Sequence, residues 1–179
     1  MWRDMAENLK RLIRDVKDYP KKGIIFRDIT TLIKEAEAFN RVVDIFCEKC
    51  GDKKVDLVAA VESRGFIFGG ALAQKLGAGF VPIRKFGKLP ADTEVESYDL
   101  EYGTDSLEIH KDAIKKGQRV VLVDDLLATG GTMEAACRLV KKLGGEVAKI
   151  LVMIELSFLK GRDRLKDYDL FSLIQYEDE

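Results

Sequence analysis

The segment from Val120 to Thr132 constrains the fold of this chain more than any other. It reads Val-Val-Leu-Val-Asp-Asp-Leu-Leu-Ala-Thr-Gly-Gly-Thr. The apolar run Val120–Val123 is typical of a buried parallel strand, and a helical pattern of apolar residues begins at Met133. This order predicts an α/β fold in which Asp124 and Asp125 lie at the carboxyl end of a strand, where open α/β sheets bind ligands.

The turn after the two carboxylates is suited to an anion. Gly130 and Gly131 allow positive φ angles and close approach of the backbone to a ligand, while Thr129 and Thr132 add hydroxyl donors. Backbone N–H groups at the start of a helix favour a phosphate group. We therefore interpret Ala128–Thr132 as a phosphate-binding loop.

Asp124 and Asp125 complement this loop. Ionised carboxylates accept hydrogen bonds, and the vicinal hydroxyls of a ribose donate them. Their negative charge would also stabilise positive charge that develops on the sugar ring. Surface or helix-capping acids are the alternative, but the strand and the loop around the pair favour a phosphorylated ribose as the ligand. The chain contains neither G-x-x-x-x-G-K-[ST] nor G-x-G-x-x-G, which removes the main support for a triphosphatase or a dinucleotide-binding dehydrogenase.

A second loop, Glu62-Ser-Arg-Gly65, offers a hydroxyl from Ser63, a guanidinium from Arg64 and backbone amides. An arginine side chain matches a pair of phosphate oxygens, although an ordinary turn with a solvated arginine is the alternative. Parallel strands would place this loop and the 126–132 loop at one edge of the sheet, where one ligand could touch both.

The remaining pattern divides the chain into further elements. The ranges expected to be strands are 55–61, 80–84, 120–123 and 147–154, and those expected to be helices are 39–50, 66–76 and 133–143. Helical spacing of Leu9, Leu12, Ile13 and Val16 predicts an additional helix at the start of the chain.

Residues 85–103 are polar, contain Pro90 and show little periodicity of core residues, which predicts a functional or mobile segment. Arg84, Lys85 and Lys88 lie at its start, and this cluster suits a pyrophosphate beneath a closing lid, although such charge runs are usually solvated. Glu101 near its end is a candidate proton donor or acceptor, with a surface acid as the alternative.

The bulk properties fit a single domain over residues 1–179. Hydrophobic residues make up 46% of the chain, and the formal net charge of −1 provides no overall attraction to nucleic acid. No apolar run is long enough to span a membrane and no secretory signal is evident. The three cysteines then predict reduced thiols in the cytoplasm. Cys47-Glu-Lys-Cys50 has no second pair with which to form a zinc site.

These motifs together resemble a known family. Val120–Thr132 is similar to the phosphoribosyl-pyrophosphate signature of the type I phosphoribosyltransferases. Further segments resemble the adenine-specific members of that family, in the expected order from about Tyr19 to the C-terminus: 23–29 (GIIFRDI), 62–66 (ESRGF), 83–90 (IRKFGKLP), 98–103 (YDLEYG) and 171–176 (FSLIQY).

The resemblance implies a central, mostly parallel sheet flanked by helices, with a small hood at about residues 19–32 and a flexible lid at about 85–103. It implies transfer of the phosphoribosyl group from phosphoribosyl pyrophosphate to adenine, which yields AMP and pyrophosphate. It also implies Mg²⁺ held by substrate and water without direct protein ligands, and a cytosolic homodimer with no nucleic-acid or membrane partner.

The resemblance further assigns roles to individual residues. Arg64, Glu101 and Tyr102 would form the catalytic group, with Glu101 transferring a proton at the purine and Tyr102 shielding the site. The substrate-binding residues that it implies are, for adenine, Ile25 and Arg27 through main-chain groups, with Phe26 packed on the ring; for pyrophosphate, Ser63, Arg64, Arg84, Lys85 and Lys88; for the ribose hydroxyls, Asp124 and Asp125; and for the 5′-phosphate, Ala128, Thr129, Gly130, Gly131 and Thr132.

Two rival functions share these motifs. A regulatory protein could sense phosphoribosyl pyrophosphate and bind nucleic acid, but it would need a basic face or a DNA-binding appendage, and neither is evident. A transferase for orotate, xanthine or hypoxanthine is opposed only by the resemblance of residues 23–29. Phe86 stands where the family would have Arg or Pro, and Glu62 replaces an Asp of some relatives.

Overall fold

A computed structural model describes residues 2–99 and 103–178, with only the backbone described for residues 2–4. The helices are α1 Trp2–Lys10, α2 Thr30–Ile33, α3 Ala36–Cys50, α4 Gly65–Leu76 and α5 Gly131–Lys142, with short 3₁₀ helices η1 Ser157–Leu159 and η2 Gly161–Leu165. The strands are β1 Arg14–Lys17, β2 Ile25–Asp28, β3 Leu57–Val61, β4 Gly79–Lys85, β5 Thr93–Asp99, β6 Thr104–His110, β7 Arg119–Leu127, β8 Glu146–Leu156 and β9 Leu170–Tyr176.

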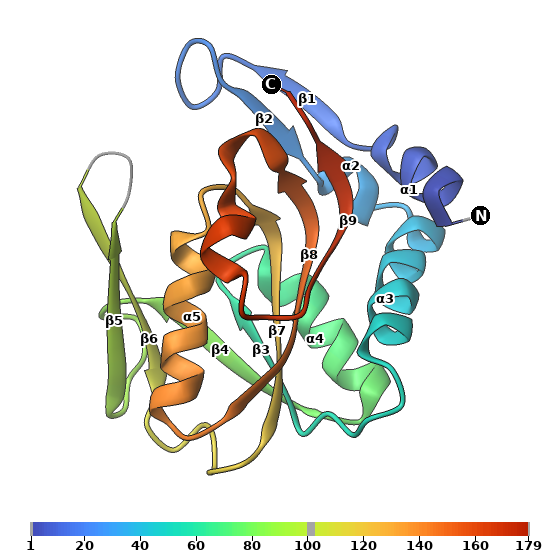
Figure 1. Cartoon of the computed structure of the whole chain (residues 1–179). Helices are drawn as coiled ribbons and strands as arrows, with labels where there is room; N and C mark the ends of the chain where they lie inside the picture. The colour runs from blue at the N-terminus through green and yellow to red at the C-terminus, as the bar shows by residue number, and fades with distance from the viewer. Residues whose placement is uncertain (1, 100–102, 179) are drawn as a thin grey trace.

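The main sheet has the strand order β5-β6-β4-β3-β7-β8-β9. Its five strands β4, β3, β7, β8 and β9 pair in parallel, whereas β5 and β6 are antiparallel at one edge. Helix α5 covers one face, and α3 and α4 cover the other (Figure 1). The predicted mostly parallel sheet flanked by helices is confirmed.

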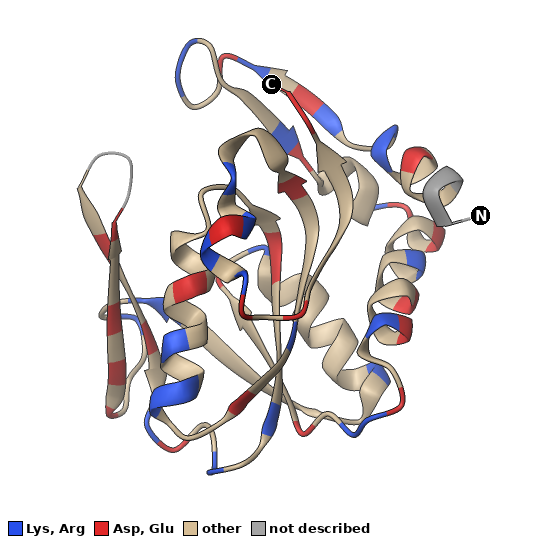
Figure 2. Ribbon diagram, in the orientation of Figure 1, with Lys and Arg blue, Asp and Glu red and all other residues tan. Residues whose placement is uncertain are grey.

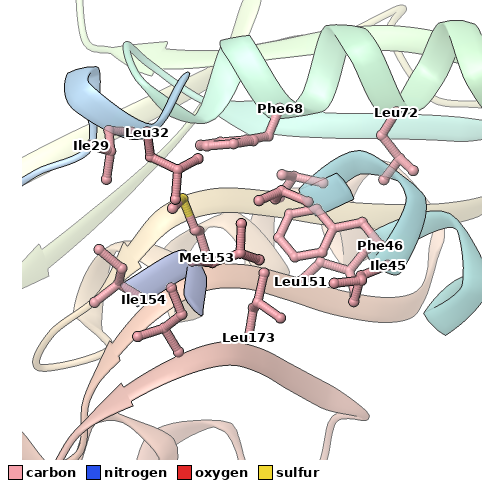
Figure 3. Packing of buried hydrophobic residues seen from close by; sticks show 14 of the residues in the cluster. Ile29, Leu32, Ile45, Phe46, Phe68, Leu72, Leu151, Met153, Ile154 and Leu173 are labelled. Carbon is pink, nitrogen blue, oxygen red and sulfur yellow. The ribbon is translucent and has the colours of Figure 1, made fainter. Parts of the chain in front are cut away.

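Two apolar layers hold the helices on the sheet. On the α3–α4 side, Phe46 and Phe68 are fully buried with ring centroids 6.2 Å apart, next to Leu151 and Met153 of β8 (Figure 3). Burying one side chain of this size stabilises the fold by about 1.5–3 kcal/mol. This packing fixes the edge of the sheet at which the loops after β3 and β7 emerge.

The predicted N-terminal helix is wrong in its second half. Helix α1 ends at Lys10, Leu12 is 39% exposed, and Val16 lies in β1, opposite Phe26 of β2. The pairing of β1 with β2 supplies backbone hydrogen bonds that the local periodicity does not reveal. These two strands form a separate two-stranded sheet that includes part of the predicted hood.

The described part of the segment 85–103 is more regular than predicted. Residues 93–99 form β5, paired with β6 along its whole length. Glu96 binds Arg138 at 2.9 Å and Lys142 at 2.5 Å, so ion pairs to α5 replace the apolar burial that would have identified a strand. Figure 2 shows acidic residues along β5 and basic residues on the neighbouring α5.

Candidate active site

The loops after β3 and β7 meet at the carboxyl edge of the sheet around a cavity of about 550 Å³. The lining residues are Val61, Glu62, Ser63, Arg64, Lys85, Lys88, Tyr98, Asp105, Leu107, Asp124, Asp125, Leu126, Leu127, Ala128, Thr129, Gly130, Thr132 and Met133. Most of the predicted phosphate, ribose and pyrophosphate residues therefore face one space.

The predicted phosphate-binding loop is tighter than expected. Strand β7 continues through both carboxylates to Leu127, and α5 begins at Gly131, so Ala128–Gly130 alone connects them. Gly130 has a φ of +85°, and its carbonyl accepts the Glu134 amide at 2.9 Å as the first turn of α5 forms. The N-terminus of α5 thus opens directly onto the cavity, where it favours an anion.

The two carboxylates are held differently. Asp124 is 8% exposed, and its Oδ1 accepts the Asp125 amide at 2.8 Å. Burial, together with the charge of Asp125, raises the pKa of the Asp124 carboxyl well above its ordinary value. Asp125 Oδ2 instead accepts Arg64 Nε at 2.5 Å, so the arginine of one loop is joined to the acid of the other.

Gly65 explains how the two loops come so close. A Cβ at this position would lie 3.0 Å from Asp124 Oδ1 and 3.2 Å from the Val123 carbonyl oxygen. The absence of a side chain lets the N-terminus of α4 pack against the end of β7. The Glu62–Ser63 peptide bond, just before this point, is cis.

A partly exposed carboxylate organises the basic cluster at the end of β4. Glu62 accepts Arg84 Nε at 2.9 Å and the Lys85 amide at 2.8 Å. Burial by itself would raise the pKa of Glu62, but the Lys85 amide and the Arg84 guanidinium bring it below its ordinary value. Arg84 is thereby turned toward Glu62 and is not among the cavity-lining residues, whereas Lys85 and Lys88 are.

Three residues that make hydrogen bonds at this site were not predicted from the sequence: Tyr98, Asp105 and Glu108. Asp105 of β6 binds Lys85 Nζ at 2.9 Å and accepts the Tyr98 hydroxyl at 3.2 Å. Glu108, 2% exposed, accepts the amides of Lys88 and Leu89, each at 2.7 Å. Tyr98 belongs to the segment 98–103 that resembles the family. Nothing in the local sequence distinguishes Asp105 or Glu108 from other acids on a polar strand.

The described residues that line the cavity do not include Ile25, Phe26 or Arg27, which were predicted to bind adenine. Phe26 contacts one lining residue, since the Arg64 guanidinium lies 5.4 Å from its ring centroid. The Arg27 side chain points elsewhere, to Asp15 at 2.7 Å and over the Tyr176 ring at 4.1 Å. Ile25 and Arg27 were predicted to act through main-chain groups, a role that these side-chain contacts leave open. Gly131 packs against the Asp99 carbonyl and is not a lining residue either.

Two predicted catalytic residues, Glu101 and Tyr102, lie outside the described residues. Within the described ranges, no group of three or more His, Cys, Asp or Glu side chains is arranged to hold a metal ion. None of the helices in that part of the chain is both long enough and apolar enough to cross a membrane.

Comparison with known proteins identifies the family. Residues 30–178 match the family of the Phosphoribosyl transferase domain, so the chain belongs to the phosphoribosyltransferases. Similar proteins within that family include adenine phosphoribosyltransferases. The one from Thermotoga petrophila is 59% identical over 169 residues, which cover 94% of this chain and 99% of that protein.

Solved structures agree in fold. The crystal structure of adenine phosphoribosyltransferase from Thermoanaerobacter pseudethanolicus has a TM-score of 0.93 and 56% identity, covering 96% of this chain and 99% of its own. The enzyme from Saccharomyces cerevisiae has a TM-score of 0.91 and 39% identity, with 96% and 99% coverage. That structure holds adenine and D-2,5-dideoxy-2,5-imino-altritol 1,6-bisphosphate.

Proposed function

We propose that this chain transfers the phosphoribosyl group from 5-phosphoribosyl 1-pyrophosphate to adenine, a purine-salvage reaction that yields AMP and pyrophosphate. The observation that carries this proposal is a single cavity that joins a phosphate-binding loop, two carboxylates and lysines from a third segment. The high identity to adenine phosphoribosyltransferases supports the choice of base.

Each part of the substrate has a matching group. Ala128–Thr132 would hold the 5′-phosphate, and Asp124 and Asp125 the ribose hydroxyls. Ser63, Arg64, Lys85 and Lys88 would face the pyrophosphate, and Arg84, through its pair with Glu62, would support them. The carboxylates would stabilise the positive ribosyl centre as its bond to pyrophosphate breaks and a purine nitrogen bonds to C1′.

Adenine would lie beside Phe26, with main-chain groups of Ile25 and Arg27 reading its edge. Glu101 would take part in proton transfer at the purine, and Tyr102 would shield the site from water. Both belong to the segment 85–103, which we propose closes over the substrate as a lid.

Magnesium would enter with the substrate. Mg²⁺ prefers oxygen ligands and retains much of its water. The carboxylates that line the cavity are those of Glu62, Asp105, Asp124 and Asp125. Bound to pyrophosphate and ribose oxygens, the ion would neutralise charge on the leaving group. The lysines Lys85 and Lys88 would add to that neutralisation.

We further propose a homodimer in the cytoplasm. Ile67 of α4, Phe80 of β4 and Phe86 after β4 are 38%, 39% and 66% exposed, and apolar side chains of this size are suited to cover one another at an interface. Cys47, Cys50 and Cys137 are free thiols, which fits a reducing compartment. Light scattering of the purified protein tests the dimer.

Turnover with phosphoribosyl pyrophosphate and Mg²⁺ tests the reaction, with adenine, hypoxanthine, guanine and orotate compared as acceptors. We expect rapid nucleotide formation with adenine alone. Preference for another base would refute the specificity, and no turnover with any base would refute the reaction. Glu101→Gln should lower kcat more than it raises KM if this residue transfers a proton.

A further inference from the structure

The turn that follows β8 folds back onto the phosphate-binding loop. Lys160, with a φ of +54°, redirects the chain between η1 and η2, and Gly161 then lies directly against residues 128–130. The contact is backbone on backbone. A Cβ on Gly161 would lie 2.1 Å from the Ala128 carbonyl oxygen, and one on Gly130 would lie 2.5 Å from the Gly161 carbonyl oxygen. A shift of Gly161 toward residues 128–130 would therefore displace the phosphate-binding loop.

An arginine beside this glycine fixes the turn to the sheet. Arg162 donates from Nε to Glu155 Oε1 at 3.0 Å and from Nη2 to Glu155 Oε2 at 2.5 Å. Such a bidentate pair determines orientation as well as distance. Nη1 also donates to the Leu170 carbonyl at 3.2 Å, so one guanidinium joins η2 to both β8 and β9.

The carboxylate of Glu155 is itself held firmly. It is 4% exposed and accepts the Ser172 hydroxyl at 2.5 Å and the Gln175 amide at 3.3 Å. Burial would raise the pKa of Glu155, but the Arg162 and Ser172 hydrogen bonds bring it below its ordinary value. In β8, Glu155 lies opposite Leu127, the last strand residue before the phosphate-binding loop.

We propose that the Glu155–Arg162 pair positions the phosphate-binding loop for the 5′-phosphate of the ribosyl substrate by holding Gly161 against Ala128 and Gly130. Neither Glu155 nor Arg162 is among the described residues that line the cavity, so both are positioning residues. The inference rests on the proposed function, since the ligand of the loop is the substrate of that reaction.

The test separates the two anion subsites with two probes, ribose 5-phosphate and inorganic pyrophosphate, each titrated into the full chain by calorimetry. Gly161→Ala should weaken the binding of ribose 5-phosphate about 30-fold. The new Cβ must displace the loop, and a misplacement near 1 Å costs up to about 10²-fold in activity at a positioned site. Arg162→Lys and Glu155→Gln each keep a side chain of similar length but lose the bidentate charged pair. Each should weaken the binding of ribose 5-phosphate about fivefold. The affinity for pyrophosphate should stay within about twofold, because Lys85 at the end of β4 and Lys88 in the loop after it belong to another part of the sheet edge.

Arg164→Ala is the matched control. Arg164 lies in the same short helix, but its pair with Glu134 at 3.3 Å is half-exposed and does not involve Glu155. Its binding of both probes should match the wild type. Melting temperatures of all variants show whether they fold.

Wild-type affinity for ribose 5-phosphate in Gly161→Ala and Arg162→Lys would overturn the positioning role. An equal loss for both probes would overturn it too, because it would indicate general destabilisation. Failure of the proposed function is separately visible: the wild-type chain would then neither bind ribose 5-phosphate nor convert adenine.

Discussion

Gly130→Ala tests whether the phosphate-binding loop depends on close backbone packing. Two costs act on the variant. The φ of +85° is unfavourable for any residue with a Cβ, by about 1–2 kcal/mol. The new Cβ also lies 2.5 Å from the Gly161 carbonyl oxygen, about 0.9 Å short of ordinary contact at 3.4 Å.

The second cost should appear in catalysis. Moving the loop by almost 1 Å misplaces the 5′-phosphate, so kcat/KM for phosphoribosyl pyrophosphate should fall about 10²-fold, equivalent to about 2.7 kcal/mol. Initial rates at saturating adenine and varied phosphoribosyl pyrophosphate measure this value. Urea unfolding measures the loss of stability in the same samples.

Gly77→Ala is the matched control, because it shares the strain but not the contact. Gly77 ends α4 with a φ of +63°, and a Cβ there would meet nothing within 4 Å. We expect about 1 kcal/mol of lost stability with unchanged kinetics. If kcat/KM of Gly130→Ala stays within about threefold of the wild type, the packing argument is refuted.

Asp124→Asn should lower turnover yet hold or raise the melting temperature at pH 8. Burial raises the pKa of this carboxyl in the folded state, so the stability of the wild type falls as pH rises above the unfolded pKa of about 4. The variant has no carboxyl to ionise and should lack that fall. A lower stability of the variant at pH 8 would contradict this reasoning. Asp28 is the opposite case, since hydrogen bonds from Thr30 and Arg14 lower its pKa to about 2. Asp28→Asn should cost about 1 kcal/mol at pH 7 in urea unfolding, and the difference should close between pH 4 and 2; a pH-independent difference would count against the linkage. Glu62→Gln should raise KM for phosphoribosyl pyrophosphate about tenfold by releasing the basic cluster, whereas Glu146→Gln, in an exposed pair distant from the cavity, should not. Equal kinetics for the two glutamine variants would remove the organising role of Glu62.

Local patterns predicted the parts of the site that consecutive residues build. The apolar run before Asp124, the carboxylates and the glycine turn at Gly130 are each recognisable within a dozen residues, because a buried strand, a turn and a helix start have local signatures. The parallel order of two such units was enough to place the loops of Arg64 and Gly130 at one edge of the sheet.

Local patterns failed where distant partners decide the structure. Strand β5 is polar because Glu96 is satisfied by Arg138 and Lys142 of α5, which the sequence of β5 cannot show. Val16 follows helical spacing, yet it joins a strand because β2 pairs with it.

The sequence by itself determined the α/β class and the chemistry of the Asp124–Thr132 segment, because periodicity, charge and glycine content are properties of neighbouring residues. Only the tertiary structure decided that Asp105 and Glu108 hold the basic cluster, and that Gly161 must lack a side chain. Those requirements arise from contacts across the sheet and between loops, and the strand order that creates them comes from the packing of the whole chain.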